Sequence, residues 1–142
     1  MEIVSVMDII NGSKPFTDRS YTFSTAGNYR KSCMFIRGAN DDKDTNANSV
    51  QTTINVRSPC TVYLDFWGGS SHLAKVSSWI GDWNESSNAK ATVFDQSGPG
   101  IVMKRDFHSA KIDLMGNNGN GHGTYYAFVC PQGQFVNSAK SV

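Results

Sequence analysis

The chain has 142 residues, 39% of them hydrophobic, which is the size and composition of a globular domain with one core. Thirteen Lys plus Arg against twelve Asp plus Glu leave a net charge of +1, so no strong positive field favours nucleic acid or anionic lipid as a partner. No apolar run approaches the ~20 residues of a transmembrane helix, and no linker divides the chain. We therefore predict a single domain over 1–142 with no transmembrane segment, in which 132–142 form a loose tail.

The amino end has no basic stretch before its first apolar residues, so it lacks the pattern of a signal peptide. We expect a cytoplasmic protein as the chain stands, or a secreted one if a signal has been removed.

The first third of the chain predicts three strands separated by turn residues. Residues 4–10 are rich in β-branched side chains and stop at Asn11-Gly12. Residues 21–24 alternate aromatic with small polar side chains, and 29–37 repeat larger side chains on one parity.

The clearest strands lie in the middle of the chain, over 49–57 and 60–66. In the first, β-branched residues recur at every second position: Val50, Thr52, Ile54 and Val56. In the second, the alternate positions hold Cys60, Val62, Leu64 and Phe66. Trp67 therefore falls on the opposite side, just before the Gly68-Gly69 turn, where we predict an exposed ring.

A short helix is predicted after this turn, from Ser70 or Ser71 to about Gly81. The apolar residues there recur at intervals of three and four: Leu73, Val76, Trp79, Ile80 and Trp83. We expect one or two turns that cover a sheet edge or an end of the fold.

Four more short strands are predicted over 91–95, 101–108, 111–115 and 124–130. About eight or nine short strands with at most one short helix indicate an all-β, antiparallel β-sandwich or jelly roll. Residues 20–37 resemble the strand-turn-strand rhythm of jelly-roll carbohydrate-binding modules, a rhythm that many unrelated sandwiches share, so it identifies no family.

Three cysteines, Cys33, Cys60 and Cys130, lack the spacing of a metal site. Buried free thiols are the simpler interpretation. The alternative is a disulfide between Cys60 and Cys130, because each lies beside a proline at a predicted strand end.

Aromatic and polar residues gather between residues 63 and 85, a mixture that suits a sugar, whose ring packs on aromatic faces and whose hydroxyls pair with carboxylates and amides. The candidate ligand-binding residues here are Tyr63, Asp65, Trp67, Trp83 and Asn84. Core packing is the alternative for each tryptophan.

Two polar loops add further candidates. The glycine-rich stretch 116–123 precedes a strand rather than a helix, so it suits a binding loop better than a phosphate site, and it supplies Asn117, Asn118, Asn120 and His122. The second loop concentrates oxygen ligands typical of calcium, with a solvated turn as the alternative: Asp41, Asp42, Asp44 and Asn46.

These features predict a non-catalytic, lectin-like or carbohydrate-binding β-sandwich whose partner is a carbohydrate or glycoconjugate. It requires no cofactor, and calcium is the one ion that the sequence suggests. One alternative is a structural protein that forms a homo-oligomer through exposed aromatics and strand edges. A second is a small β-sandwich hydrolase that pairs carboxylates among Asp65, Asp82 and Glu85.

Overall fold

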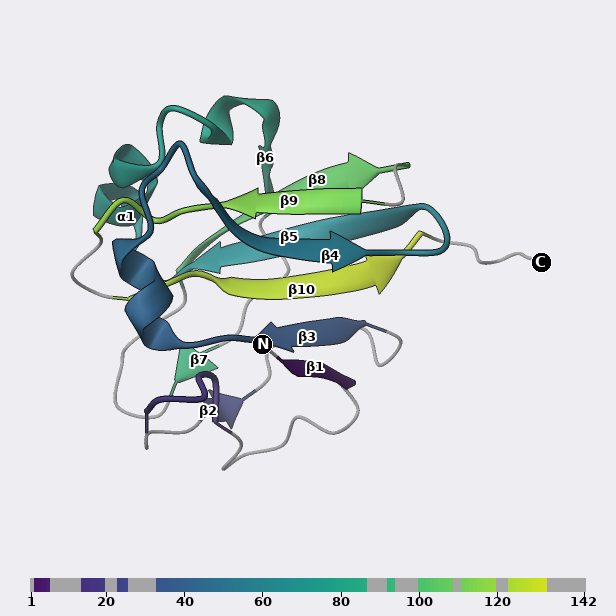
Figure 1. Ribbon diagram of the computed structural model, residues 1–142, viewed down its shortest axis with the longest axis horizontal. Coiled ribbons are helices and arrows are strands. Elements are labelled where there is room, and N and C mark those ends of the chain that lie inside the picture. The colour runs from purple at the N-terminus through teal and green to yellow at the C-terminus, as the bar shows by residue number, and fades with distance from the viewer. Residues whose placement is uncertain are drawn as a thin grey trace.

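The computed structural model describes residues 2–5, 14–19, 23–25, 33–86, 92–93, 100–108, 111–119 and 123–132. These segments form strands in antiparallel sheets with one α-helix, α1 (Ser70–Lys75), and two 3-10 helices, Asn40–Asp44 and Ile80–Asp82 (Figure 1). The strands are β1 (Glu2–Ser5), β2 (Phe23–Thr25), β3 (Met34–Arg37), β4 (Val50–Asn55), β5 (Cys60–Phe66), β6 (Asn84–Ser86), β7 (Thr92–Val93), β8 (Ile101–Phe107), β9 (Lys111–Met115) and β10 (Tyr126–Pro131). The prediction of an all-β sandwich is confirmed.

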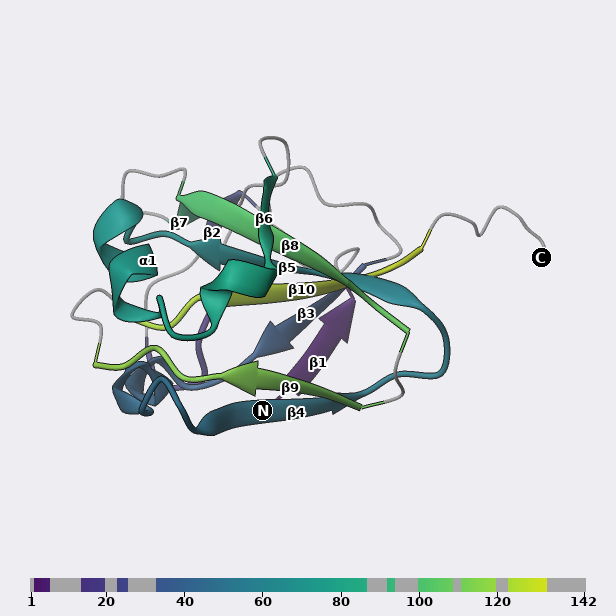
Figure 2. The ribbon, with the colours of Figure 1, turned by 90° about the horizontal axis from the view of Figure 1, so that it is seen from above.

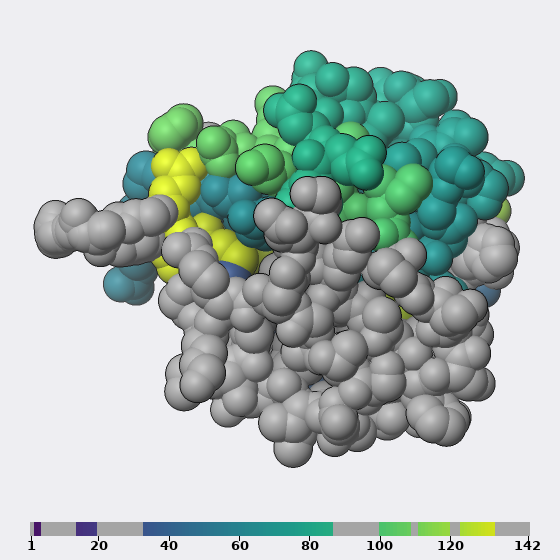
Figure 3. Space-filling model, turned by 180° about the vertical axis from the view of Figure 1, so that it is seen from behind, coloured from purple at the N-terminus to yellow at the C-terminus, as the bar shows by residue number. Residues whose placement is uncertain are grey.

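The largest sheet has six strands in the order β1-β3-β10-β5-β8-β6, and every neighbouring pair is antiparallel. Strands β4 and β9 form a second sheet, and β2 pairs with β7. Seen from above, β4 and β9 lie as a separate layer in front of the large sheet (Figure 2). Seen from behind, the teal and green parts of the molecule's surface adjoin each other (Figure 3). Strand β6 pairs with β8 along the edge of the large sheet.

The main core lies between the large sheet and the β4-β9 layer. Strand β5 contributes the alternating residues predicted from the sequence: Cys60, Val62, Leu64 and Phe66. Strand β9 contributes Ile112 and Leu114, both 1% exposed. Successive residues of a strand point to opposite faces of the sheet. A strand whose alternate residues are apolar therefore buries those side chains in the core, while its other side chains make different contacts. The hydrophobic effect of this one-sided burial holds the two layers together.

The opposite face of the large sheet carries an aromatic cluster. The rings of Phe35 and Phe128 lie 5.0 Å apart across β3 and β10. Phe16 packs on Tyr126 at 5.4 Å, and both are almost fully buried. Strand β10 is therefore buried on both faces, as expected of a central strand covered on two sides.

The predicted strands over 60–66 and 111–115 are confirmed to the residue by β5 and β9. The predicted helix is confirmed in place but shorter: α1 ends at Lys75, and a turn leads to the 3-10 helix Ile80–Asp82. Strand β6 follows directly and was not predicted. Of the predicted tail, the structure describes Gln132, and 133–142 lie outside the described residues.

Strand β4 departs from its predicted phase at a β-bulge. Its pairing with β9 shifts between Val50 and Thr52, so Gln51 is the extra residue. Beyond the bulge Ile54 is buried as expected, but before it Val50 is 48% exposed. The predicted alternation from Val50 to Val56 is therefore interrupted at the bulge, and Gln51 turns inward to bond with Thr124.

The predicted alternative of a Cys60–Cys130 disulfide is also wrong. Cys130 is bonded to Cys33, while Cys60 is a buried free thiol. The register explains the difference: Cys60 lies opposite Pro131, whereas Cys130 lies opposite Thr61. A one-residue offset places two strand side chains on opposite faces of a sheet, so the thiols of Cys60 and Cys130 point apart.

Candidate functional site

The acidic segment, the Trp67 turn and the glycine-rich loop are far apart in the sequence but meet at one end of the sandwich, around the start of α1 (Figure 1). We call this region, residues 39–49, 67–72, 116–119 and 123–125, the loop end. The peptide N–H of Gly119 donates to the carbonyl of Lys43 at 2.8 Å, and that of Asn118 to the carbonyl of Thr45 at 2.7 Å. The glycine-rich loop is therefore joined by backbone hydrogen bonds to the acidic segment.

Thr124 connects the tryptophan to both loops through its backbone. Its N–H donates to Asn40 Oδ1 at 3.0 Å, and its carbonyl accepts from Trp67 Nε1 at 3.0 Å. Asn40 is 4% exposed, so this amide is part of the interior of the loop end.

Asn117 is the centre of a buried polar network. Its Oδ1 accepts from His72 Nε2 at 2.7 Å and from the Tyr125 N–H at 3.2 Å. Its Nδ2 donates to Gln51 Oε1 at 2.7 Å and to Thr124 Oγ1 at 2.6 Å. Asn117 and His72 are both fully buried. Buried polar groups are tolerated when they are hydrogen-bonded in this way, and the network then fixes one arrangement of the segments.

Gly123 shows how closely the loop end is packed. Its φ of 126° is a conformation that side chains disfavour, and a Cβ there would lie 2.2 Å from Asn40 Oδ1 and 2.9 Å from Trp67 Cζ2. Only glycine lets the backbone pass between the Asn40 amide and the tryptophan ring.

Trp67 was predicted to be exposed, and the structure places it half-buried. Its ring is parallel to that of Tyr126 within 5°, with the centroids 6.0 Å apart. Tyr126 therefore supports the indole while the Thr124 carbonyl fixes its N–H. A ring held this way has a defined orientation at the loop end, although less of it reaches solvent than the sequence suggested.

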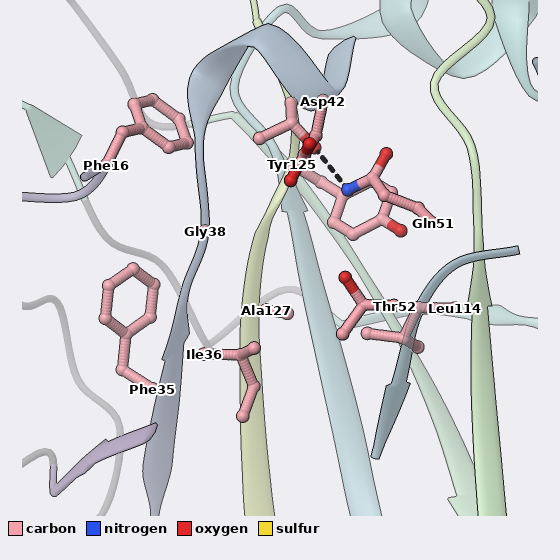
Figure 4. Close-up of a pocket in the computed structure, with 11 residues that line it drawn as sticks. Phe16, Phe35, Ile36, Gly38, Asp42, Gln51, Thr52, Leu114, Tyr125 and Ala127 are labelled. Carbon is pink, nitrogen blue, oxygen red and sulfur yellow. Dashed lines mark hydrogen bonds between the residues drawn. The ribbon is translucent and has the colours of Figure 1, made fainter. Parts of the chain in front are cut away.

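A small cavity lies next to the network, between the sheet and the loop end (Figure 4). Its polar lining includes Asp42, Gln51 and Thr124, and its apolar lining includes Phe35 and Ile36. Its volume is about 20 Å³, room for one ordered water and far too little for a sugar ring. A sugar does not fit in this cavity, so the loop end would hold one on its outer surface rather than here.

The Asp18 side chain, from a distant part of the sequence, binds the first residues of the acidic segment. The Asp18 carboxylate accepts from the N–H groups of Asn40 and Asp41, and Arg19 bridges Asp18 and Asp41 at 3.0 and 2.8 Å. Burial works against the charge of Asp18, but these bonds and Arg19 outweigh it and lower its pKa. Burial raises the pKa of the Asp42 carboxyl, and the negative charges of Asp18 and Asp41 raise it further.

Calcium binding by this segment stays a prediction. Among the described residues, no three His, Cys, Asp or Glu side chains gather closely enough to hold a metal ion. Asp41 is engaged by Arg19, and Asn46 Oδ1 accepts from the N–H of Asn48 at 2.8 Å.

The remaining candidate residues are placed elsewhere or lie outside the description. Trp83 is 7% exposed in the main core, where it packs edge-to-face on Phe107. Tyr63, half-buried, and Asn84, exposed, flank Lys104 in one cross-strand row of β5, β8 and β6, away from the loop end. Asn118 is exposed at the loop end with a positive φ of 60°. Asn120 and His122 lie outside the described residues.

Asp65 and Glu85, two of the three carboxylates considered for hydrolysis, do not lie on one face of the sheet. Asp65 is fully buried in the cross-strand row of Val102 and Ser86, whereas Glu85 belongs to the next row, with Leu64 and Met103. Adjacent rows point to opposite faces of a sheet, so Asp65 and Glu85 cannot act on one bond.

Three residues of the network were not selected from the sequence: Gln51, His72 and Thr124. Gln51 is hidden by the bulge, which no composition signal marks. His72 belongs to the predicted helix but off its apolar stripe. Thr124 follows a glycine-rich loop at the start of a predicted strand, and that position is the one signal that could have selected it.

Comparison with solved structures finds a β-glucuronidase from glycoside hydrolase family 2, with a TM-score of 0.63 and 15% sequence identity. The match covers 92% of this chain and 13% of that chain, so the chain spans a small part of the enzyme's length. No protein-family model matches the sequence, and neither does any curated protein. At this identity the likeness shows the fold, a β-sandwich domain. No helix among the described residues is long and apolar enough to cross a membrane.

Proposed function

We propose that this chain is a non-catalytic carbohydrate-binding domain that holds its ligand on the outer surface of the loop end. The observation that carries the proposal is the convergence there of Trp67, the acidic segment and the glycine-rich loop, three elements with the chemistry of sugar recognition. The β-sandwich likeness to a domain-sized part of a glycoside hydrolase is consistent with an accessory domain that binds a sugar.

The surface of the loop end offers the required groups. Exposed amides and hydroxyls are present at Asn46, Asn48, Ser70 and Asn118, and such groups exchange hydrogen bonds with sugar hydroxyls. Trp67 supplies the apolar contact at the edge of this surface.

The test is binding of the wild-type protein to a glycan array, followed by titration of any sugar found. Asn118→Gly removes the exposed amide, together with the 3.4 Å hydrogen bond that its Oδ1 accepts from the Ala47 N–H, while keeping the positive φ acceptable. We expect affinity to fall about tenfold, roughly 1.4 kcal/mol. The matched control is Asn84→Ala, an exposed asparagine on β6, which should bind like wild type. If both variants bind with wild-type affinity, the sugar does not bind at the loop end. If the wild type binds no glycan, the proposal is refuted.

Light scattering after size exclusion separates this proposal from the assembly alternative. Strand β1 is an edge strand whose Ile3 is 54% exposed, so it is the natural place for an added strand. We expect a monomer. A defined oligomer that Ile3→Lys dissociates, in a protein that binds no glycan, would favour assembly instead.

A further inference from the structure

We propose that Asn117 and Thr124 are positioning residues of the loop-end site, an inference that rests on the proposed function. They touch no ligand themselves, but hold Trp67, Asn40 and the glycine-rich loop in the arrangement that binds it. Asn117 was predicted from the sequence as a ligand contact, and this proposal gives it a different role.

Asn117 has no hydrogen-bonding capacity left for a ligand. A side-chain amide offers two donor hydrogens and an oxygen with two acceptor sites. The oxygen accepts from His72 and Tyr125, and the two hydrogens go to Gln51 and Thr124. Since Oδ1 is an acceptor, His72 Nε2 must carry the proton of that bond. With the side chain fully buried as well, a sugar could reach it only by dismantling the network.

The Thr124 side chain fixes a backbone to which two site elements are attached. Its Oγ1 accepts from both Asn117 Nδ2 and Gln51 Nε2, at 2.6 and 2.9 Å (the second bond is dashed in Figure 4). Its backbone N–H and carbonyl bind Asn40 and Trp67. A shift of Thr124 would therefore move the indole and the acidic segment together.

The network links four separate elements: α1 through His72, the β4 bulge through Gln51, the glycine-rich loop through Asn117, and the approach to β10 through Thr124 and Tyr125. None of its side-chain bonds belongs to a strand ladder. The sheets and the backbone bonds between the glycine-rich loop and the acidic segment can therefore persist when the network is broken, whereas Thr124 loses the side-chain bonds that fix its backbone beside Trp67 and Asn40. Preorganisation of this kind raises affinity because the site is not ordered at the ligand's expense.

The experiment compares two changes of a threonine, one that removes its hydroxyl and one that removes its methyl group. Thr124→Val removes the hydroxyl that Asn117 and Gln51 share, and Thr124→Ser retains it. Thr53→Val is the matched control, because Thr53 Oγ1 donates to Asp113 Oδ1 at 2.8 Å on the exposed β4-β9 layer, apart from the loop end. We expect Thr124→Val to weaken glycan binding at least tenfold, Thr124→Ser to restore most of the affinity, and Thr53→Val to bind normally. If Thr124→Val does not fold, Gln51→Met opens the same network from its half-buried side.

Exchange of the Trp67 indole hydrogen, followed by NMR, tests positioning without any ligand. It should accelerate in Thr124→Val but not in Thr124→Ser or Thr53→Val. Wild-type-like affinity or unchanged indole exchange in a folded Thr124→Val protein overturns the inference. If the wild type binds no glycan but the exchange pattern holds, the proposed function fails while the anchoring of Trp67 by Thr124 stands.

Discussion

Gly123 is the residue whose identity the backbone restricts most clearly. Gly123→Ala would place a methyl group on Asn40 Oδ1 at a φ of 126°. We expect it to destabilise the protein by about 1–3 kcal/mol in urea unfolding, the usual cost of a strained backbone position. Gly81→Ala is the control, because a Cβ at Gly81 meets open space. That change should be neutral or stabilise by up to about 1 kcal/mol, since alanine restricts the unfolded chain. Similar stabilities for the two variants would contradict this packing.

Asp18 and Asp42 should respond to pH in opposite directions. The pKa of Asp18 is lowered on folding, so its contribution to stability is present above the ordinary carboxyl range and is lost as pH falls. The pKa of Asp42 is raised by burial, so its charged form disfavours folding at neutral pH, and this cost disappears on acidification. Asp18→Asn should therefore lower the urea midpoint at pH 7, and Asp42→Asn should raise it.

The Asp42 difference should shrink as pH falls through its raised pKa, and the Asp18 difference should shrink only as pH falls through the lowered pKa of the folded state, below which both states are protonated. Asp44→Asn serves as a reference for loss of a neighbouring exposed carboxylate. A lower midpoint for Asp42→Asn at pH 7 would show that the carboxylate has a stabilising partner that outweighs its burial.

At the level of elements, the strands with uninterrupted apolar alternation could be predicted from the sequence, whereas the strand with a bulge could not. The bounds of β5 and β9 follow from alternation alone, because in each strand every second residue is apolar and belongs to the main core. The bulge at Gln51 reverses the faces of β4 without any marker in the sequence, and it supplies a residue of the polar network. The disulfide partner depends on strand order, which alternation does not contain, since β10 lies between β3 and β5.

The disulfide between Cys33 and β10 should stabilise the sheet. Cys33→Ala is expected to cost about 2–5 kcal/mol, the usual loss for a native disulfide, whereas Cys60→Ala should cost only about 1 kcal/mol for a small cavity. Without reductant, the unfolded wild type should expose one reactive thiol. Three reactive thiols under those conditions would contradict the bond.

The 3-10 helix Asn40–Asp44 gives the calcium prediction a direct test. An ion bound only by the folded state raises the melting temperature by mass action. If Asp41, Asp42, Asp44 and Asn46 hold calcium, chelator should lower the melting temperature and millimolar calcium should restore it, while Asp44→Asn should abolish the response. An identical melting curve in chelator and calcium would leave the segment as a hydrogen-bonded turn.

At the scale of the whole molecule, the sequence predicts the sandwich and the parts of the site, but not how the parts are joined. Short alternating strands and turn residues require two packed layers whatever the strand order. Trp67, the acidic segment and the glycine-rich loop were each recognisable by composition. Their junction depends on Thr124 and Asn117, whose bonding partners lie up to 84 positions away in the chain and therefore leave no local pattern.

The Cys33–Cys130 bond joins residues separated by 97 positions, so most of the chain lies within one covalent loop. A protease that cuts once at an exposed turn inside that loop divides the backbone without releasing a fragment. The cleaved protein would migrate as one species under non-reducing electrophoresis and as two after reduction. Residues 39–49 and 123–125 would stay on one particle even when the cut falls between them, so a nick at the exposed turn Arg57-Ser58 between β4 and β5 should leave the proposed sugar binding in place until a reductant is added.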